Sequence, residues 1–484
     1  MFKDTIKLKL QSIRARITRN TFTTTFFIVI LVHCIAQGII QSLLLALDSK
    51  YNVLTNTIIN AAQVPKANHT DLLVNSDYYR LQVCNFIPHN DQDCSIAFDT
   101  RDFDNGTIGN GVDTNPEHDS FLRGENIAHL IASGARFVAN TSDPVKYLQV
   151  ENPLQPTDSV TLSQQCIETL LYPSQHFHNA RREDIALLVL QLWLLGISVL
   201  AVYYDSVPHI LAGLIAHILF TTWSIYSLWR TFYQQTIFDQ MIETPGTYCS
   251  ISMFSAYFRT RIAYEICDLV LNITAFAFAT YSTWYLVRVF NTKSVQRLAA
   301  PKRVKAIYGY FLAVQVCLQL EAFIMMTWMG LWLDQLENSY VSQISNHLSI
   351  FRGIFVWYTV LLGPWMLLGW WGIRLEKRIL TAVFILMSFV FTAVAGIMLY
   401  SQVYRWTFYA WPFFGCMVVF SLVLLVFTFP LSILCWMNFG KGLAQYLHAD
   451  SVLASSNFTI EVFEHDVEKD VKPDRKTSLH ELGL

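Results

Sequence analysis

Eight long apolar segments constrain the fold of this chain more than any other feature. A helix of about 20 apolar residues spans the roughly 30 Å hydrocarbon core of a bilayer. Segments of this kind are Thr23–Leu47, Asp184–Tyr203, His209–Trp229, Ala263–Val287, Ile307–Trp332, Ile350–Gly372, Leu380–Tyr400 and Trp406–Trp436. Because 53% of the residues are hydrophobic and only 14% are charged, a water-soluble fold could not cover this apolar surface. The sequence therefore predicts a polytopic α-helical membrane protein with about eight transmembrane helices.

A polar insertion, residues 48–183, separates the first apolar segment from the other seven. Its residue patterns predict strands at Tyr78–Phe86 and Val145–Val150 and a helix at Asn126–Phe137, while Val160–Tyr172 fits either element. We therefore expect a small α/β domain here. The expected divisions of the whole chain are a basic tail (1–22), a signal-anchor helix (23–47), the insertion (48–183), a seven-helix transmembrane block (184–437) and a partly disordered tail (438–484).

The basic residues predict an orientation, because Lys and Arg are enriched on the cytoplasmic flanks of transmembrane helices. If the N-terminus is cytoplasmic, fifteen basic residues flank the segments on that side and five lie in the short loops on the other. The fifteen are Lys3, Lys7, Lys9, Arg14, Arg16, Arg19, Arg288, Lys293, Arg297, Lys302, Arg303, Lys305, Arg374, Lys377 and Arg378; the five are Arg230, Arg259, Arg261, Arg352 and Arg405. This bias predicts that both termini are cytoplasmic and that the insertion is extracellular.

The first apolar segment can be interpreted as a cleaved signal peptide or as an uncleaved signal anchor. Its apolar core exceeds the roughly 7–15 residues of a secretory signal, and no clear cleavage site follows, so we favour the anchor. His33, Gln37 and Gln41 recur at helical spacing within it. We expect these three side chains to form one face that packs on the other helices.

Sequons and cysteines agree with an extracellular insertion. Asn68, Asn105 and Asn140 each begin an N-x-S/T sequence and are predicted glycosylation sites. Four of the nine cysteines are predicted to lie outside the membrane on the same side, namely Cys84, Cys94, Cys166 and Cys249. An even number suits an oxidising compartment. Of the three possible pairings we favour Cys84–Cys94 with Cys166–Cys249; free thiols are the alternative.

A few ionisable residues fall inside the apolar segments, where they are costly to bury and often functional. Glu321 lies near the middle of the fifth segment, Asp268 and Glu265 lie near the start of the fourth, and His217 lies near the middle of the third. Such groups could form a proton relay or a cation site. The alternative is structural, with Glu321 hydrogen-bonded to Gln315, Gln319 or a neighbouring helix. Pro364, Pro412 and Pro430 are expected to kink the sixth and eighth segments.

Several function classes are disfavoured. Phosphate-binding, serine hydrolase and zinc protease motifs are absent from the sequence, and the longest expected cytoplasmic loop is too short for a catalytic domain. We therefore expect no enzyme, no cofactor and no metal. The net charge of −2 gives no basic excess for nucleic acid. The expected partners are membrane lipid and a protein or small molecule at the insertion.

Five short runs carry a family resemblance: Arg182–Ala186, Asp205–His209, Trp332–Leu336, Tyr404–Phe408 and Asn438–Leu443. With these runs the chain resembles a fungal, chiefly basidiomycete, family of multi-pass membrane proteins, most of which are uncharacterised. The similarity covers most of the chain from the second span onwards. A virulence protein described in this family implies a plasma-membrane, hyphal-tip location and a role in host infection. The resemblance carries no assigned functional residues.

Three functions are compatible with the sequence. The insertion could bind a ligand or partner that the helices sense, or the protein could be a non-catalytic scaffold at the cell surface. The runner-up is a proton- or cation-coupled transporter or channel that uses Glu321. We expect a surface protein of one of the first two kinds.

Overall fold

The computed structural model describes residues 21–64, 69–75, 78–84, 94–104, 136–140, 147–151, 159–204, 206–298, 301–338 and 348–455. The helices are α2 (Thr21–Ala61), α3 (Thr100–Asp104), α5 (Gln164–Tyr203), α6 (Val207–Phe238), α7 (Ser255–Leu298), α8 (Lys302–Asn338), α10 (Leu348–Arg374), α11 (Arg378–Met398), α12 (Gln402–Ala410), α13 (Pro412–Met437) and α14 (Leu443–Ser455). The strands are β1 (His69–Val74), β2 (Tyr79–Cys84), β3 (Cys94–Asp99), β4 (Arg136–Asn140), β5 (Tyr147–Glu151) and β6 (Ser159–Ser163).

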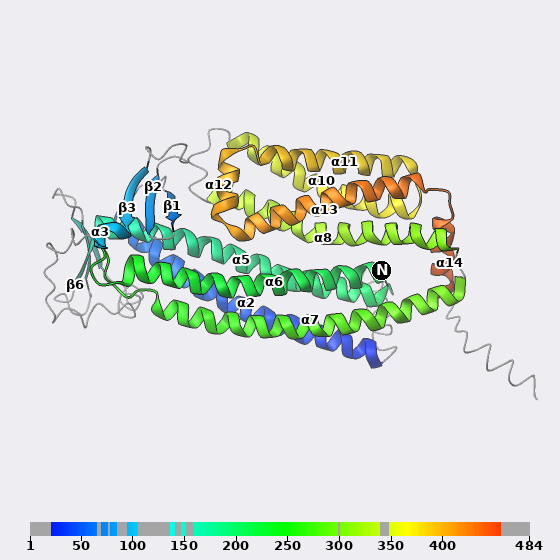
Figure 1. Ribbon diagram of the computed structural model, residues 1–484, viewed down its shortest axis with the longest axis horizontal. Helices are drawn as coiled ribbons and strands as arrows, with labels where there is room; N and C mark the ends of the chain where they lie inside the picture. The colour runs from blue at the N-terminus through cyan, green and yellow to red at the C-terminus, as the bar shows by residue number, and fades with distance from the viewer. Residues whose placement is uncertain are drawn as a thin grey trace, which may run out of the picture.

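Eight of the described helices are long and apolar enough to cross a membrane, so the chain is a helical membrane protein, as predicted. They pack in two groups of four (Figure 1). The first helix group consists of α2, α5, α6 and α7, and the second consists of α8, α10, α11 and α13. The groups meet mainly where α6 packs on α8. This grouping differs from the expected anchor helix and block of seven, because α2 packs closely on α5 and α7.

Both sheets lie at one end of the helices, which we call the sheet end; α14 lies at the other, the α14 end (Figure 1). The helices of the first group continue beyond the expected apolar segments at the sheet end. With 41 residues and about 1.5 Å of rise per residue, α2 is about 60 Å long, twice the hydrocarbon core. The expected insertion boundaries at Asp48 and Glu183 therefore fall inside α2 and α5 rather than at their ends.

The insertion contributes two three-stranded antiparallel sheets, β1-β2-β3 and β4-β5-β6. The strands β2 and β5 lie within or next to the two strands expected from the sequence. The ambiguous segment Val160–Tyr172 contains the end of β6 and the start of α5. Most of the helix expected at Asn126–Phe137 lies outside the described residues, and its end is wrong, because Phe137 belongs to β4. Phe137 and Val138 at the centre of β4 are aromatic and β-branched residues, which favour strands.

Among the described residues, the strands share one apolar core with the helix ends. Leu81, Phe98, Leu148 and Leu162 from the strands pack in one apolar cluster with side chains from the helix extensions. The helix residues of this cluster include Tyr51, Leu54, Ile58, Leu170, Phe177, Phe238, Phe254 and Tyr257. The expected α/β domain is thus built from strands that rest on the ends of transmembrane helices.

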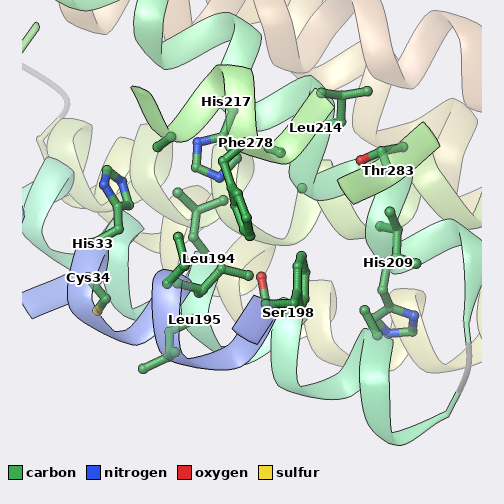
Figure 2. A pocket seen from close by; sticks show the side chains of 18 of the residues that line it. His33, Cys34, Leu194, Leu195, Ser198, His209, Leu214, His217, Phe278 and Thr283 are labelled. Atoms are coloured by element: carbon green, nitrogen blue, oxygen red, sulfur yellow. The ribbon is translucent and has the colours of Figure 1, made fainter. Parts of the chain in front are cut away.

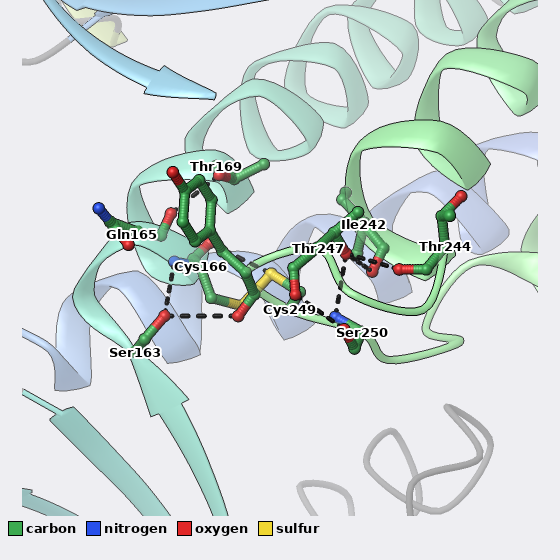
Figure 3. The surroundings of a disulfide bond; sticks show 10 residues. Ser163, Gln165, Cys166, Thr169, Ile242, Thr244, Thr247, Cys249 and Ser250 are labelled. Atoms are coloured by element: carbon green, nitrogen blue, oxygen red, sulfur yellow. Dashed lines mark hydrogen bonds between the residues drawn. A yellow bond between two sulfur atoms is a disulfide. The ribbon is translucent and has the colours of Figure 1, made fainter. Parts of the chain in front are cut away.

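Two disulfides fasten this arrangement, and they are the pairs preferred from the sequence. Cys84 and Cys94 are register partners on the neighbouring strands β2 and β3. Cys166 near the start of α5 is bonded to Cys249 in the segment between α6 and α7 (Figure 3). Ser163 caps α5 beside this bond: its hydroxyl accepts from the amide of Cys166 at 3.2 Å and donates to the carbonyl of Tyr248 at 3.4 Å. The start of α5 is therefore held to the segment that follows α6.

The eighth expected segment, Trp406–Trp436, is broken rather than kinked. Trp411 is extended, with φ −127° and ψ 91°, and separates α12 from α13. Pro412 explains the break, since proline disfavours a helical residue before it and is well suited to begin a helix. The short helix α12 consequently turns across the sheet end (Figure 1). Gly415 is needed close to this turn, because a Cβ there would lie 2.9 Å from the carbonyl oxygen of Phe408.

The Cys166–Cys249 bond is expected to stabilise the protein more than Cys84–Cys94. Removing a native disulfide typically costs roughly 2–5 kcal/mol. The first bond joins separate elements 83 residues apart, whereas the second joins strands that already pair. Cys166→Ser/Cys249→Ser should therefore lower the thermal unfolding temperature of the full chain in detergent by more than Cys84→Ser/Cys94→Ser. Equal shifts for the two double variants would contradict this ranking.

Candidate functional site

Three consecutive charged residues, Arg182, Glu183 and Asp184, lie buried within α5. We call them the charged triplet. All three are nearly buried, with exposed fractions of 5%, 3% and 2%. Because successive residues on an α-helix point about 100° apart, the three side chains face different neighbours. The triplet therefore connects α5 to most of the helices that surround it.

Arg182 and Glu183 join the two helix groups. The Arg182 guanidinium forms an ion pair with Asp334 and a hydrogen bond with Gln335, both at the sheet end of α8. Glu183 accepts hydrogen bonds from both terminal nitrogens of Arg230 in α6, at 3.0 and 2.6 Å. The indole N–H of Trp411, between α12 and α13, donates to the same carboxylate at 2.7 Å. A paired arrangement of this kind is what makes buried charges tolerable.

Asp184 faces the opposite way, towards α2 and α7. It lies beside Asp48 and near Arg261. The Arg261 guanidinium contacts both carboxylate oxygens of Asp48 at 2.5 Å and donates to Glu265 at 2.9 Å. The Tyr257 hydroxyl also donates to Asp48, at 2.9 Å. This cluster holds α2, α5 and α7 together at the sheet end of their apolar segments.

A cavity of about 480 Å³ is lined by Glu183 of the charged triplet, and we call it the sheet-end pocket. Its walls come from three parts of the molecule: the strand β1, the first helix group, and α12 with Trp411. The residues are Thr70 and Asp71 in β1, Gln175 and Glu183 in α5, Trp229, Arg230 and Tyr233 in α6, and Trp406, Tyr409 and Trp411 in or next to α12. The Trp229 and Tyr233 rings are nearly parallel, at 6° with centroids 5.8 Å apart. Partial burial raises the pKa of the Asp71 carboxyl above its ordinary value. The pocket thus combines aromatic surface with a few polar groups.

A second line of polar side chains runs down the interior of the first helix group, and we call it the buried polar row. On α7 it consists of Arg261, Glu265, Asp268 and Asn272, which recur at helical spacing and extend over about 16 Å. Glu265 accepts from Ser227 at 3.2 Å and from Thr231 at 2.9 Å, both in α6. Asp268 accepts from Gln37 and Gln41 in α2 and from Ser224 in α6. The structure therefore brings two of the four intramembrane candidates, Glu265 and Asp268, into one row.

His217 lies beyond the deep end of this row. Its ring centroid is 5.9 Å from that of His33 on α2, and both line a cavity of about 40 Å³ (Figure 2). His209 and Thr283 line the same cavity towards its other end (Figure 2). The prediction that His33, Gln37 and Gln41 share one packed face is confirmed, because all three face α5, α6 or α7. We call this space the histidine cavity.

Glu321, the fourth candidate, lies apart from these groups in the second helix group. It is fully buried in α8 and accepts a hydrogen bond from Ser421 in α13 at 3.2 Å. This contact is the expected bond to a neighbouring helix. Its other carboxyl oxygen and the amides of Gln315 and Gln319 have no hydrogen-bond partner among the described residues. Glu321 thus belongs to neither the buried polar row nor the sheet-end pocket.

The sequence did not reveal the strongest part of the site. From the sequence, Arg230 and Arg261 were expected to be loop charges, whereas both are buried in helix contacts. Arg182, Glu183 and Asp184 were recognised only as part of a run that carries the family resemblance and as the boundary between the insertion and the second apolar segment. The charged residues that flank the apolar segments were a usable signal. If neighbouring helices continue past the membrane, such charges can pair between them.

Only one of the three predicted glycosylation sites falls in the described residues. Asn68 and Asn105 lie outside them, and Asn140 is the last residue of β4. Within the described ranges, no group of three or more His, Cys, Asp or Glu side chains could hold a metal ion. No protein-family model, curated protein or solved structure matches this chain. The site is therefore interpreted from its own geometry.

The Glu183–Arg230 pair yields a stability prediction. Arg230→Gln leaves Glu183 buried without its cation, and breaking a buried ion pair from one side typically costs about 3–5 kcal/mol. We expect a marked fall in the unfolding temperature in detergent. The double variant Glu183→Gln/Arg230→Gln should lose less than the sum of the single variants, because neither partner is left charged.

Arg352→Gln is the matched control for this experiment. It breaks the Arg352–Glu337 pair, whose side chains are 61% and 41% exposed, and exposed pairs contribute little to stability. Its unfolding temperature should stay close to that of the wild type. Additive losses in the Glu183/Arg230 cycle would show that the two side chains do not act as a pair.

Proposed function

We propose that the protein is a ligand-binding receptor or sensor, in which the sheet-end pocket binds a small molecule and the two helix groups respond. The observation that carries this proposal is the composition of the pocket walls. One wall is β1 of the insertion, a second is α5 and α6 of the first helix group, and a third is α12 with Trp411. An occupant would contact all three parts at once.

The dimensions and chemistry of the pocket support ligand binding. Its volume of about 480 Å³ lies within the roughly 300–1,000 Å³ typical of small-molecule sites, which are mostly apolar with a few placed polar groups. Thr70 on β1 is held to α5 by its hydroxyl, which donates to Gln175 at 2.8 Å. The strand therefore covers a defined space rather than a loose surface.

The charged triplet could couple ligand binding in the pocket to a change in how the two helix groups pack. Glu183 lines the pocket and is bonded both to Arg230 of the first helix group and to Trp411, next to the second. A ligand shifts a conformational equilibrium only by its difference in affinity for the two states. An occupant that binds Arg230 or Trp411 differently in two arrangements of the groups would supply such a difference.

We further propose a cell-surface location with both termini cytoplasmic and the sheet end outside. The basic residues and the two disulfides support this placement. A role in host infection follows only from the resemblance to fungal membrane proteins and stays a prediction. The 4+4 packing gives no support to a seven-helix receptor of the G-protein-coupled type.

Blocking the pocket tests the proposal. Ala410→Trp places a large ring on an exposed pocket residue without removing a hydrogen-bond partner, and Ala382→Trp does the same on an exposed face of α11 as a control. Soluble small molecules can be screened for thermal stabilisation of the purified full chain. We expect compounds that stabilise the wild type and Ala382→Trp to lose their effect on Ala410→Trp. Equal stabilisation of all three proteins would place the binding site elsewhere.

Cation transport is a second candidate function, and the buried polar row favours it. The row and the histidine cavity together extend through the first helix group from Arg261 towards His209. On this proposal Asp268, rather than Glu321, is the residue that transport needs. In proteoliposomes, Asp268→Asn should abolish proton or Na⁺ flux, while Glu321→Gln should retain it. The reverse result would return the transport proposal to Glu321, and no flux in the wild type would exclude transport of these ions.

A further inference from the structure

Asp268 is a carboxylate inside the first helix group that has only neutral partners among the described residues. The amides of Gln37 and Gln41 contact its Oδ1 atom, the latter at 2.7 Å. The hydroxyl of Ser224 and the amide of Asn272 donate to its Oδ2 atom at 2.7 and 3.0 Å. Arg261, on the same helix, is engaged by Asp48 and Glu265 instead. Hydrogen bonds stabilise the carboxylate but leave its charge uncompensated at a depth where an isolated charge is unfavourable.

The shell around Asp268 contains oxygen atoms that the protein itself does not satisfy. Gln37 is fully buried and Gln41 is 3% exposed, yet the carbonyl oxygen of each amide has no hydrogen-bond partner. Each of these oxygens belongs to the amide group that contacts the carboxylate. Buried polar atoms are nearly always paired, so two unpaired oxygens on amides that contact the same carboxylate need an explanation. Rotation of an amide by half a turn exchanges its oxygen and nitrogen and brings the oxygen towards Asp268.

We propose that Asp268, Gln37, Gln41, Ser224 and Asn272 form a binding site for a Na⁺ ion between α2, α6 and α7. The carboxylate supplies the single negative charge that a monovalent cation neutralises. The amide and hydroxyl groups supply neutral oxygen ligands in place of the hydration shell of the ion. This site is separate from the sheet-end pocket and does not depend on the receptor function proposed for it.

The donor set selects among cations. All five side chains offer hard oxygen ligands, and none is the thiolate or imidazole that zinc and copper prefer. Ca²⁺ and Mg²⁺ sites usually contain more carboxylate charge than one aspartate supplies. The side chains converge closely from three helices, which suits the smaller Na⁺ better than K⁺. A monovalent, Na⁺-selective site is the simplest match to this charge and packing.

The histidine cavity lies close to the proposed site. His33, which lines it, lies one helical turn from Gln37, and Ala275 in its wall lies one turn from Asn272. A volume of about 40 Å³ is enough for a few waters, since one water needs roughly 10–15 Å³. Waters in this cavity would lie within about one helical turn of Gln37 and Asn272.

Thermal unfolding of the purified full chain in detergent tests the site. NaCl is titrated against KCl or choline chloride at constant ionic strength, so that screening of surface charges is the same in each series. A cation that binds only the folded state raises the unfolding temperature in a saturable manner. We expect this rise with Na⁺ and not with choline, and a much weaker one with K⁺.

Two site variants and a control test whether the response to Na⁺ depends on the proposed ligands. Asp268→Asn should abolish the response to Na⁺, because it removes the only charge of the site. Ser224→Ala keeps the charge and loses one ligand, so its apparent Na⁺ affinity should fall roughly tenfold or more. Asp239→Asn, at the start of the short π-helix Asp239–Glu243 that follows α6, removes a carboxylate outside the site and should respond to Na⁺ as the wild type does.

Direct binding of radioactive ²²Na⁺ to the wild-type protein provides a second measurement that needs no variant to fold. Saturable binding that excess NaCl displaces and choline chloride does not displace is expected. The proposal is overturned if ²²Na⁺ does not bind, if all three salts shift the unfolding temperature equally, or if Asp268→Asn retains the wild-type response to Na⁺.

Discussion

The need to satisfy three adjacent charges inside one helix determines how the helices of this protein are arranged. Arg182, Glu183 and Asp184 cannot all face solvent or lipid, and the helical turn sends them in different directions. Each direction must therefore hold a partner of suitable charge. Asp334 and Arg230 are the partners of Arg182 and Glu183, and Asp184 lies beside the Asp48–Arg261 pair; these groups come from four different helices. A wrong neighbour on any side would leave a buried charge unpaired, so these contacts favour one packing over its alternatives.

This requirement also explains why the two helix groups meet where they do. At the α14 end, Glu376 between α10 and α11 accepts hydrogen bonds from the backbone amides of Gly440, after α13, and Ala444 in α14. At the sheet end, by contrast, Arg182 and Glu183 reach across to Asp334 and Trp411. The polar contacts described between the groups are concentrated at the sheet end. Apolar packing of α6 on α8 completes the contact deeper down.

The sequence predicted the elements of this fold better than their assembly. Apolar length alone identified eight membrane helices, and cysteine positions singled out both disulfides. It could not show that α2 and α5 continue for several turns beyond Leu47 and before Asp184, because polar residues on a supporting helix look like those of a soluble domain. Proline at position 412 predicted a kink, but whether a helix bends or breaks depends on the packing around Trp411.

For the site, the sequence identified the ionisable residues that are unfavourable to bury in a membrane, but it did not identify their partners. Asp268 and Glu265 were recognisable as charges in an apolar segment, and the structure adds the neutral shell of Gln37, Gln41 and Ser224 that only the packing of three helices creates. Glu321 had the same signal in the sequence but contacts only Ser421 among the hydrogen-bonding groups described. A single buried acid in a sequence therefore does not reveal whether it belongs to a network.

The Cys166–Cys249 bond has a consequence for how the protein is made. Cys166 lies near the start of the second membrane helix and Cys249 follows the third, so α5 and α6 form a hairpin whose two ends the bond closes. When both helices cross the membrane, the two sulfur atoms lie on the same side of it and can meet. Oxidation of this pair thus marks a correctly inserted hairpin, and a chain in which one helix failed to insert would keep two reactive thiols.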